Sequence, residues 1–144
     1  MKTATLITFA VFGLAASMPA TASAGDMLFY ARNNCQGPVI FRYPVNVTTS
    51  DNCKRRGNRC SGRNDQARSM FMPNAGPWSL IIYDSPDGET DDDYADIRSP
   101  VATNYKDGKC IASFERNTPE VKYRRHNGLD GKVSRIAVNY IKLR

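Results

Sequence analysis

Two segments with the same order of residue types lie in the two halves of this chain, and they limit the possible folds more than any other feature. Residues 63–70 and residues 127–138 each begin with polar or turn-forming residues. Each continues with an apolar linker residue, Ala67 or Val133, then a polar pair and an apolar residue that can start a strand. A turn that leads into a strand is typical of the end of a β unit. We therefore interpret the segments as the closing corners of two similar halves of one domain.

The first 24 residues have the composition of a secretory signal. Lys2 supplies a positive charge, residues 6–16 are mostly apolar, and Ala22-Ser23-Ala24 ends the segment with small residues. The apolar run is short for a membrane span. We expect a signal peptide at residues 1–24, one folded domain at residues 25–144, and an extracellular or periplasmic protein that does not cross a membrane.

Four cysteines follow the signal, and an even count in a secreted chain indicates two disulfides. Three pairings of Cys35, Cys53, Cys60 and Cys110 are possible. We favour Cys53–Cys60, which closes a short polar loop, together with Cys35–Cys110 as a long-range bridge. A metal site built from these cysteines is disfavoured, because the spacing is not CxxC and the chain has a single histidine.

The remaining pattern is that of an all-β protein. Short apolar or alternating runs predict strands at residues 27–30, 38–43, 70–72, 78–83, 94–98, 110–115, 121–124 and 136–140, and residues 45–63 are predicted to form a loop. No window shows the periodicity of an amphipathic helix. The expected core consists of Leu28, Tyr30, Ile40, Phe41, Met70, Leu80, Ile82, Ile97, Ile111, Ile136 and Val138. Short strands, Gly/Pro turns and two similar halves favour a sandwich or a barrel.

Short motifs in both halves carry a resemblance to a known family. Residues 30–37 contain an aromatic, four further residues, Cys35 and, after one more residue, Gly37, and residues 83–88 hold a shortened version. The closing corners read Asn-Asp-Gln-Ala-Arg-Ser at residues 64–69 and Asp-Gly-Lys-Val-Ser-Arg at residues 130–135. In order and duplication these motifs resemble the βγ-crystallin superfamily. The resemblance spans residues 27–138 and implies two Greek-key units packed as a disulfide-braced β-sandwich.

The same resemblance implies paired calcium sites at the closing corners. The side chains of Asn64, Asp65, Asp130 and Ser134 and the carbonyls of Gln66 and Lys132 are the expected ligands, and hard oxygens of these kinds suit calcium. The chain departs from the family at Arg68, where a hydroxyl is expected, and at Gly131. A guanidinium at about 4 Å repels a divalent ion by several kcal/mol. We therefore expect one weak site at most.

The alternative is that Asn64, Asp65 and Asp130 bond only to nearby backbone N–H groups and stabilise turns.

Charge is unevenly distributed in a chain of formal net charge +6. A basic cluster contains Lys54, Arg55, Arg56, Arg59, Arg63 and Arg68, and an acidic run extends over residues 84–96. Such runs are commonly solvated loops. The basic cluster is also suited to contact with an anionic surface. The carboxylates of residues 87–93 could attract cations loosely, but they lack the spacing of a ligand loop.

These features favour a secreted, non-enzymatic βγ-crystallin-like protein with weak or vestigial calcium binding and a stress, structural or binding role. The alternative is a secreted protease inhibitor or an antimicrobial or killer-type toxin, acting through Lys54, Arg55, Arg56 and Arg59 on an unidentified protein or an anionic surface. We expect no nucleic-acid partner.

Enzyme functions are poorly supported by the sequence. No Gly-x-Ser-x-Gly motif is present. A remote alternative is a small ribonuclease that uses Glu115, Arg116, Arg124 and His126 for general acid–base cleavage.

Overall fold

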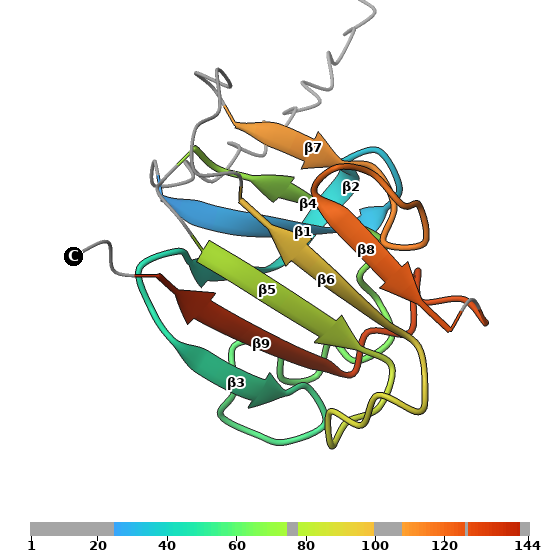
Figure 1. The fold of residues 1–144 in the computed structure, drawn as a ribbon. Coiled ribbons are helices and arrows are strands. Elements are labelled where there is room, and N and C mark those ends of the chain that lie inside the picture. The colour runs from blue at the N-terminus through green and yellow to red at the C-terminus, as the bar shows by residue number, and fades with distance from the viewer. Residues whose placement is uncertain (1–24, 75–77, 100–107, 126, 142–144) are drawn as a thin grey trace, which may run out of the picture.

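The computed structural model describes residues 25–74, 78–99, 108–125 and 127–141, which form two antiparallel sheets (Figure 1). The strands are β1 (Asp26–Arg32), β2 (Gln36–Pro44), β3 (Thr49–Asn52), β4 (Ser69–Met72), β5 (Trp78–Tyr83), β6 (Tyr94–Arg98), β7 (Lys109–Ile111), β8 (Val121–Arg124) and β9 (Arg135–Tyr140). No helix occurs in these ranges, so the all-β prediction is confirmed for the described part of the chain. The predicted signal peptide at residues 1–24 lies outside it.

The two halves of the chain exchange one strand each. The four-stranded sheet has the order β2-β1-β4-β7, and the five-stranded sheet has the order β3-β9-β5-β6-β8. Strand β3 comes from the first half but pairs with β9, while β7 comes from the second half but pairs with β4. Apart from these two strands, the first half supplies the adjacent strands β2, β1 and β4. The second half supplies β6, β5 and β9, with β8 next to β6 at the edge. Each sheet therefore contains strands from both halves.

Strand β3 corrects the sequence prediction, which placed residues 45–63 in a loop. Its four residues, Thr-Ser-Asp-Asn, are all polar, and Asp and Asn are depleted in strands. Asp51 and Asn52 are nevertheless buried. The Tyr43 hydroxyl donates to Asp51 Oδ2 over 2.9 Å, and Asn52 Nδ2 donates to the Pro86 carbonyl over 2.7 Å. Tertiary hydrogen bonds therefore compensate for the absence of apolar side chains.

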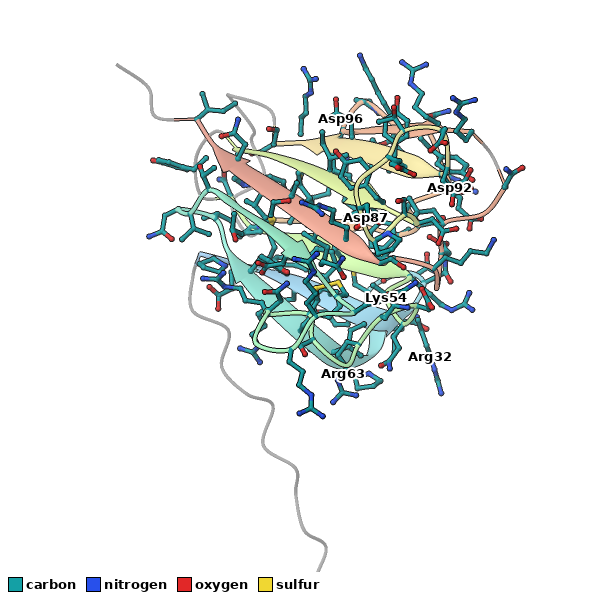
Figure 2. The ribbon with its side chains drawn as sticks, turned by 90° about the horizontal axis from the view of Figure 1, so that it is seen from below. Arg32, Lys54, Arg63, Asp87, Asp92 and Asp96 are labelled. Atoms are coloured by element: carbon teal, nitrogen blue, oxygen red, sulfur yellow. A yellow bond between two sulfur atoms is a disulfide. The ribbon has the colours of Figure 1, made fainter. Side chains whose placement is uncertain are left out.

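Charged side chains extend outward from the two sheets (Figure 2). Figure 2 shows Arg32, Lys54 and Arg63 in the lower part of the molecule and Asp87, Asp92 and Asp96 in the upper part. These three basic residues belong to the first half of the chain and these three acidic residues to the second.

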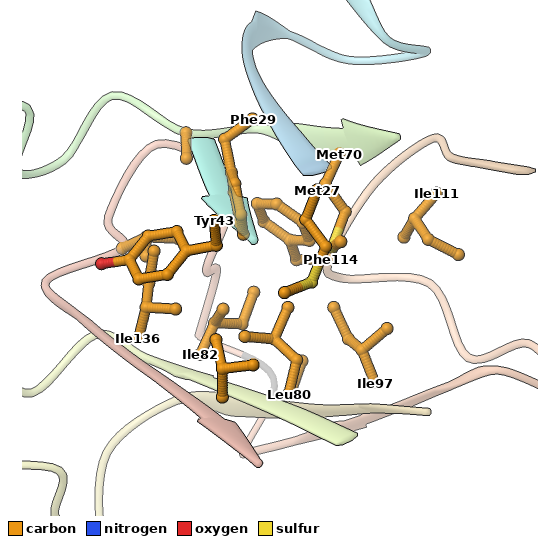
Figure 3. Packing of buried hydrophobic residues seen from close by; sticks show 14 of the residues in the cluster. Met27, Phe29, Tyr43, Met70, Leu80, Ile82, Ile97, Ile111, Phe114 and Ile136 are labelled. Atoms are coloured by element: carbon orange, nitrogen blue, oxygen red, sulfur yellow. The ribbon is translucent and has the colours of Figure 1, made fainter. Parts of the chain in front are cut away.

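The core lies between the two sheets (Figure 3). Phe29 and Met70 from one sheet face Leu80, Ile82 and Ile136 from the other, and all five are fully buried. Buried and half-buried residues alternate strictly in β5, which the sequence predicted as a buried strand.

Nine of the eleven expected core residues are buried, whereas Tyr30 and Ile40 are only half-buried. The pairing of β1 with β2 shifts register between Phe29 and Tyr30. A bulge of this kind interrupts the alternation of side chains.

The turn between β1 and β2 places Cys35 at a position where its side chain forms a disulfide. Asn34 and Cys35 have φ values of 60° and 54°, and the Gln36 N–H donates to the Asn33 carbonyl over 3.3 Å. Glycine is usual at the second central position of such a turn. Here a side chain is required, because Cys35 forms a disulfide with Cys110. The N–H of Cys35 also donates to Ser69 Oγ, which in turn donates to the Arg32 carbonyl.

Both disulfides have the favoured pairing. Cys35–Cys110 joins the β1–β2 turn to the edge strand β7, and Cys53–Cys60 closes the loop that follows β3. The first bridge spans 75 positions and the second spans 7.

Removal of the long-range bridge should destabilise the protein more than removal of the short one. Chain entropy predicts a loss of roughly 4.5 kcal/mol for Cys35→Ala/Cys110→Ala and roughly 2.5 kcal/mol for Cys53→Ala/Cys60→Ala. Urea unfolding of both double variants and the wild type measures the difference. Equal losses would show that constraint of the unfolded chain is not the main contribution of these bridges.

Candidate functional site

The two predicted corners lie against each other and exchange backbone hydrogen bonds. The Asp65 N–H donates to the Val133 carbonyl over 3.1 Å, and the Gly131 N–H donates to the Ala67 carbonyl over 2.8 Å. Asp65 and Gly131 occupy the second position of their motifs, and both have positive φ, 59° and 85°. Asp, Asn and Gly are the residues that tolerate this conformation best. The local backbone therefore explains the residue types found there.

At one crossing point, oxygens of three different kinds converge. Ser134 Oγ lies 3.2 Å from Asp65 Oδ1 and 3.4 Å from the Lys132 carbonyl oxygen. Ser134 is buried and fixed by its own backbone, because its N–H donates to the Tyr83 carbonyl and its carbonyl accepts from the Cys53 N–H, each over 2.8 Å. A carboxylate, a hydroxyl and a carbonyl are oxygen ligands that calcium accepts.

Asn64 adds a further oxygen beside this group. Its Nδ2 donates to Asp65 Oδ2, and its Oδ1 is buried without a hydrogen-bond partner in the structure. An orphaned buried acceptor is uncommon in a folded protein and is a place where an ion or a water commonly binds. Gln66 is exposed.

Asp84 is a neighbour that the sequence analysis assigned only to the acidic run. Burial raises the pKa of its carboxyl, and the negative charges of Asp92 and Asp65 raise it further while Lys132 lowers it. Asp84 directly follows Tyr83, whose carbonyl binds Ser134. No local sequence signal links Asp84 to Asp65, because the two meet only after the halves have packed.

The equivalent position on the other side is filled by Arg68. A Cβ atom placed on Gly131 would lie 3.0 Å from Arg68 Nη2 and 3.2 Å from its Cζ. By motif position, Gly131 corresponds to Asp65, and Arg68 corresponds to Ser134. The residues here do not fit a calcium ion, because a guanidinium and a side-chain hydrogen replace a hydroxyl and a carboxylate.

Asp130 is directed to a different part of the fold. Its Oδ2 accepts from Asn33 Nδ2 over 2.5 Å and from Ser113 Oγ over 2.7 Å, and its Oδ1 accepts from the Phe114 N–H over 2.8 Å. Burial raises the pKa of this carboxyl although the three hydrogen bonds act in the opposite direction. These contacts connect the second corner with the β1–β2 turn. The contacts of Asp130 agree with the alternative prediction, in which this residue stabilises turns and does not bind calcium.

The residues of the remote ribonuclease hypothesis are brought together only in part. Glu115 and Arg116 line one shallow hollow with Asn33 and Ser113. Glu115 Oε1 accepts from the backbone N–H groups of both Leu129 and Asp130, each over 2.7 Å. Arg124 lies on β8, and His126 lies outside the described residues. The structure therefore gives Glu115 a role in holding the loop before the second corner.

The basic residues Lys54, Arg55, Arg56 and Arg59 are exposed on the loop between β3 and β4. Arg59 forms an ion pair with Asp51 over 3.7 Å. Among the described residues, no three His, Cys, Asp or Glu side chains are grouped closely enough to hold a metal ion. A cation at the first corner would therefore depend on hydroxyl, amide and carbonyl oxygens in addition to the Asp65 carboxylate.

Asp84→Asn should stabilise the ion-free protein at neutral pH. A raised pKa means that folded Asp84 keeps its proton to a higher pH than the unfolded chain does, so stability falls as pH rises through that window. The benefit of Asn should shrink as pH falls toward about 4, because the wild-type carboxyl becomes increasingly protonated. Thermal unfolding at both pH values measures this.

Asp87→Asn, at an exposed carboxylate of the same loop, is the control for Asp84→Asn and should change the melting temperature little. Loss of stability in Asp84→Asn at neutral pH would contradict the assignment.

Comparison with protein-family models, with curated proteins and with solved structures found no match. Within the described ranges, no helix is long and apolar enough to cross a membrane.

Proposed function

We propose that this chain is a secreted, non-enzymatic, βγ-crystallin-like protein that binds one calcium ion weakly where its two halves cross. The observation that carries the proposal is the convergence of Asp65 Oδ1, Ser134 Oγ and the Lys132 carbonyl within hydrogen-bonding distance. Asp65 belongs to the first half, while Ser134 and Lys132 belong to the second. An ion bound there would link the two halves directly.

The arrangement of strands supports the βγ-crystallin part of the proposal. The first half keeps three strands in one sheet, the second half keeps four in the other, and each contributes one strand to the other half's sheet, as two interlocked Greek-key units would. Ser69, the last residue of the first closing motif, binds the turn between β1 and β2 through Arg32 and Cys35. The two disulfides indicate an oxidising environment, which supports secretion.

The side chains at the corner account for weak rather than tight binding. Asp65 is the single carboxylate among the three converging oxygens, and calcium affinity depends on the number of charged ligands. Lys132 adds a positive charge nearby. We expect a dissociation constant in the range of extracellular calcium modules, about 0.1–1 mM.

Calorimetric titration tests the proposal. The wild type should bind one calcium ion, and calcium at ten times the dissociation constant should stabilise the fold by about 1.4 kcal/mol. Asp65→Asn and Ser134→Ala should each abolish most of this binding. Asn suits the positive φ of residue 65, so the first variant removes charge without backbone strain. Magnesium should have little effect, because it requires a more regular octahedron.

The absence of both binding heat and any change in melting temperature at millimolar calcium would refute the function. Asp84→Asn adds a more specific criterion, since it should stabilise the ion-free protein and weaken calcium binding in the same experiment.

Arg68→Ser should increase calcium binding. The substitution removes the guanidinium that lies against Gly131 and restores a hydroxyl at the equivalent position. Affinity or stoichiometry should rise in the same titration. Arg63→Ser removes an identical charge from an exposed neighbour and should leave binding nearly unchanged. An equal gain in both variants would indicate a general charge effect, and no gain would count against the equivalence of the two corners.

A further inference from the structure

The loop between β3 and β4 is held in one conformation by contacts at both of its ends. The Cys53 N–H donates to the Ser134 carbonyl at its start, and Asp65 binds Val133 and Ser134 at its end. The buried Cys53–Cys60 disulfide closes a ring within it. Both stems of the loop are thus attached to the second corner.

Polar side chains fix the backbone inside the ring. Asn52 Oδ1 accepts from the Lys54 N–H over 2.9 Å, and Asn58 Nδ2 donates to the Asn52 carbonyl over 2.8 Å. Arg59 is held at its base by Asp51 and lies over the Tyr43 ring, with its Cζ 5.8 Å from the ring centroid. Little backbone entropy would be lost when a partner binds to such a loop.

The exposed cations of this loop are largely uncompensated. The ion pairs among the described residues are Arg59–Asp51, Arg98–Asp96 and Lys109–Glu120. Arg55, Arg56 and Arg63 form no ion pair within that part of the chain. Lys54 borders a hollow that contains Asp84, Glu89, Asp91 and Asp92, so the arginines carry the argument. A guanidinium binds phosphate and sulfate groups through two parallel hydrogen bonds.

The composition of the loop distinguishes between the possible anionic partners. From Lys54 to Arg63 it contains no aromatic side chain and no apolar side chain other than the disulfide-bonded Cys60. Single-stranded nucleic acids are usually held by stacking on aromatic rings, interfacial membrane binding uses inserted apolar side chains, and protein interfaces are centred on apolar or aromatic anchors. None of these features is present, whereas a chain of sulfate groups requires only cations at fixed positions.

We propose that the loop of residues 54–63 binds a sulfated polysaccharide through Arg55, Arg56, Arg59 and Arg63. They are exposed on the same loop as Lys54, which Figure 2 labels together with Arg63. The calcium site is not needed for this activity, so binding is measured in the presence of a chelator, and failure of either proposal leaves the other standing.

The experiment compares two double variants that lose the same charge. Arg55→Gln/Arg56→Gln alters the loop, and Lys122→Gln/Arg124→Gln alters exposed positions on β8. Calorimetry with heparin at low ionic strength should show binding that is weakened more than tenfold in the loop variant, since each basic side chain near an anionic surface contributes about fivefold. The β8 variant should lose less than threefold. Arg55→Lys/Arg56→Lys keeps the charge but not the paired hydrogen bonds and should give an intermediate loss.

Far-ultraviolet circular dichroism and melting temperature verify that each variant is folded. Absence of heparin binding by the wild type, or equal losses in the two Gln variants, would overturn the proposal. Tighter binding to a poly-dT oligonucleotide or to vesicles that contain phosphatidylserine would also overturn it, because the partner would then be a nucleic acid or a membrane surface.

Discussion

The reciprocal hydrogen bonds between the two closing corners are the interaction on which the arrangement of this molecule depends. Asp65 donates to Val133 and Gly131 donates to Ala67, so each corner completes the backbone hydrogen bonding of the other. The same contact positions Ser134 between Tyr83 and Cys53, which belong to different halves. Unpaired buried backbone groups are costly, and the corners therefore stabilise the fold as a pair rather than separately.

The exchange of strands strengthens this dependence. Strand β3 lies at the edge of the five-stranded sheet, and its buried Asp51 is satisfied by Tyr43 from the other sheet. Burial and the hydrogen bond to Asp51 raise the pKa of the Tyr43 hydroxyl, which remains a neutral donor. The four-stranded sheet is closed at one edge by β7, which Cys110 attaches to the β1–β2 turn. Neither half could bury its apolar face without the other.

Much of this architecture could be predicted from the sequence, because it depends on local pattern. The apolar run at residues 78–83 predicted a buried strand, the alternation of Ile136 and Val138 predicted a half-buried one, and an even number of cysteines predicted two bridges. Strand β3 could not be predicted, since its polar residues are placed by partners far along the chain. Asp130 shows the same limitation at the site. Its three donors come from residues 33, 113 and 114, and a local motif contains no information about them.

Attachment of both loop stems to the second corner also determines how the chain would respond to proteolysis. Lys54, Arg55, Arg56 and Arg59 all lie between the two cysteines of the short disulfide, where a trypsin-like enzyme would cut. A single cut there opens the peptide backbone but releases no fragment, because Cys53–Cys60 still joins the two pieces. The nicked protein would retain both sheets and lose only the ordered conformation of the severed loop.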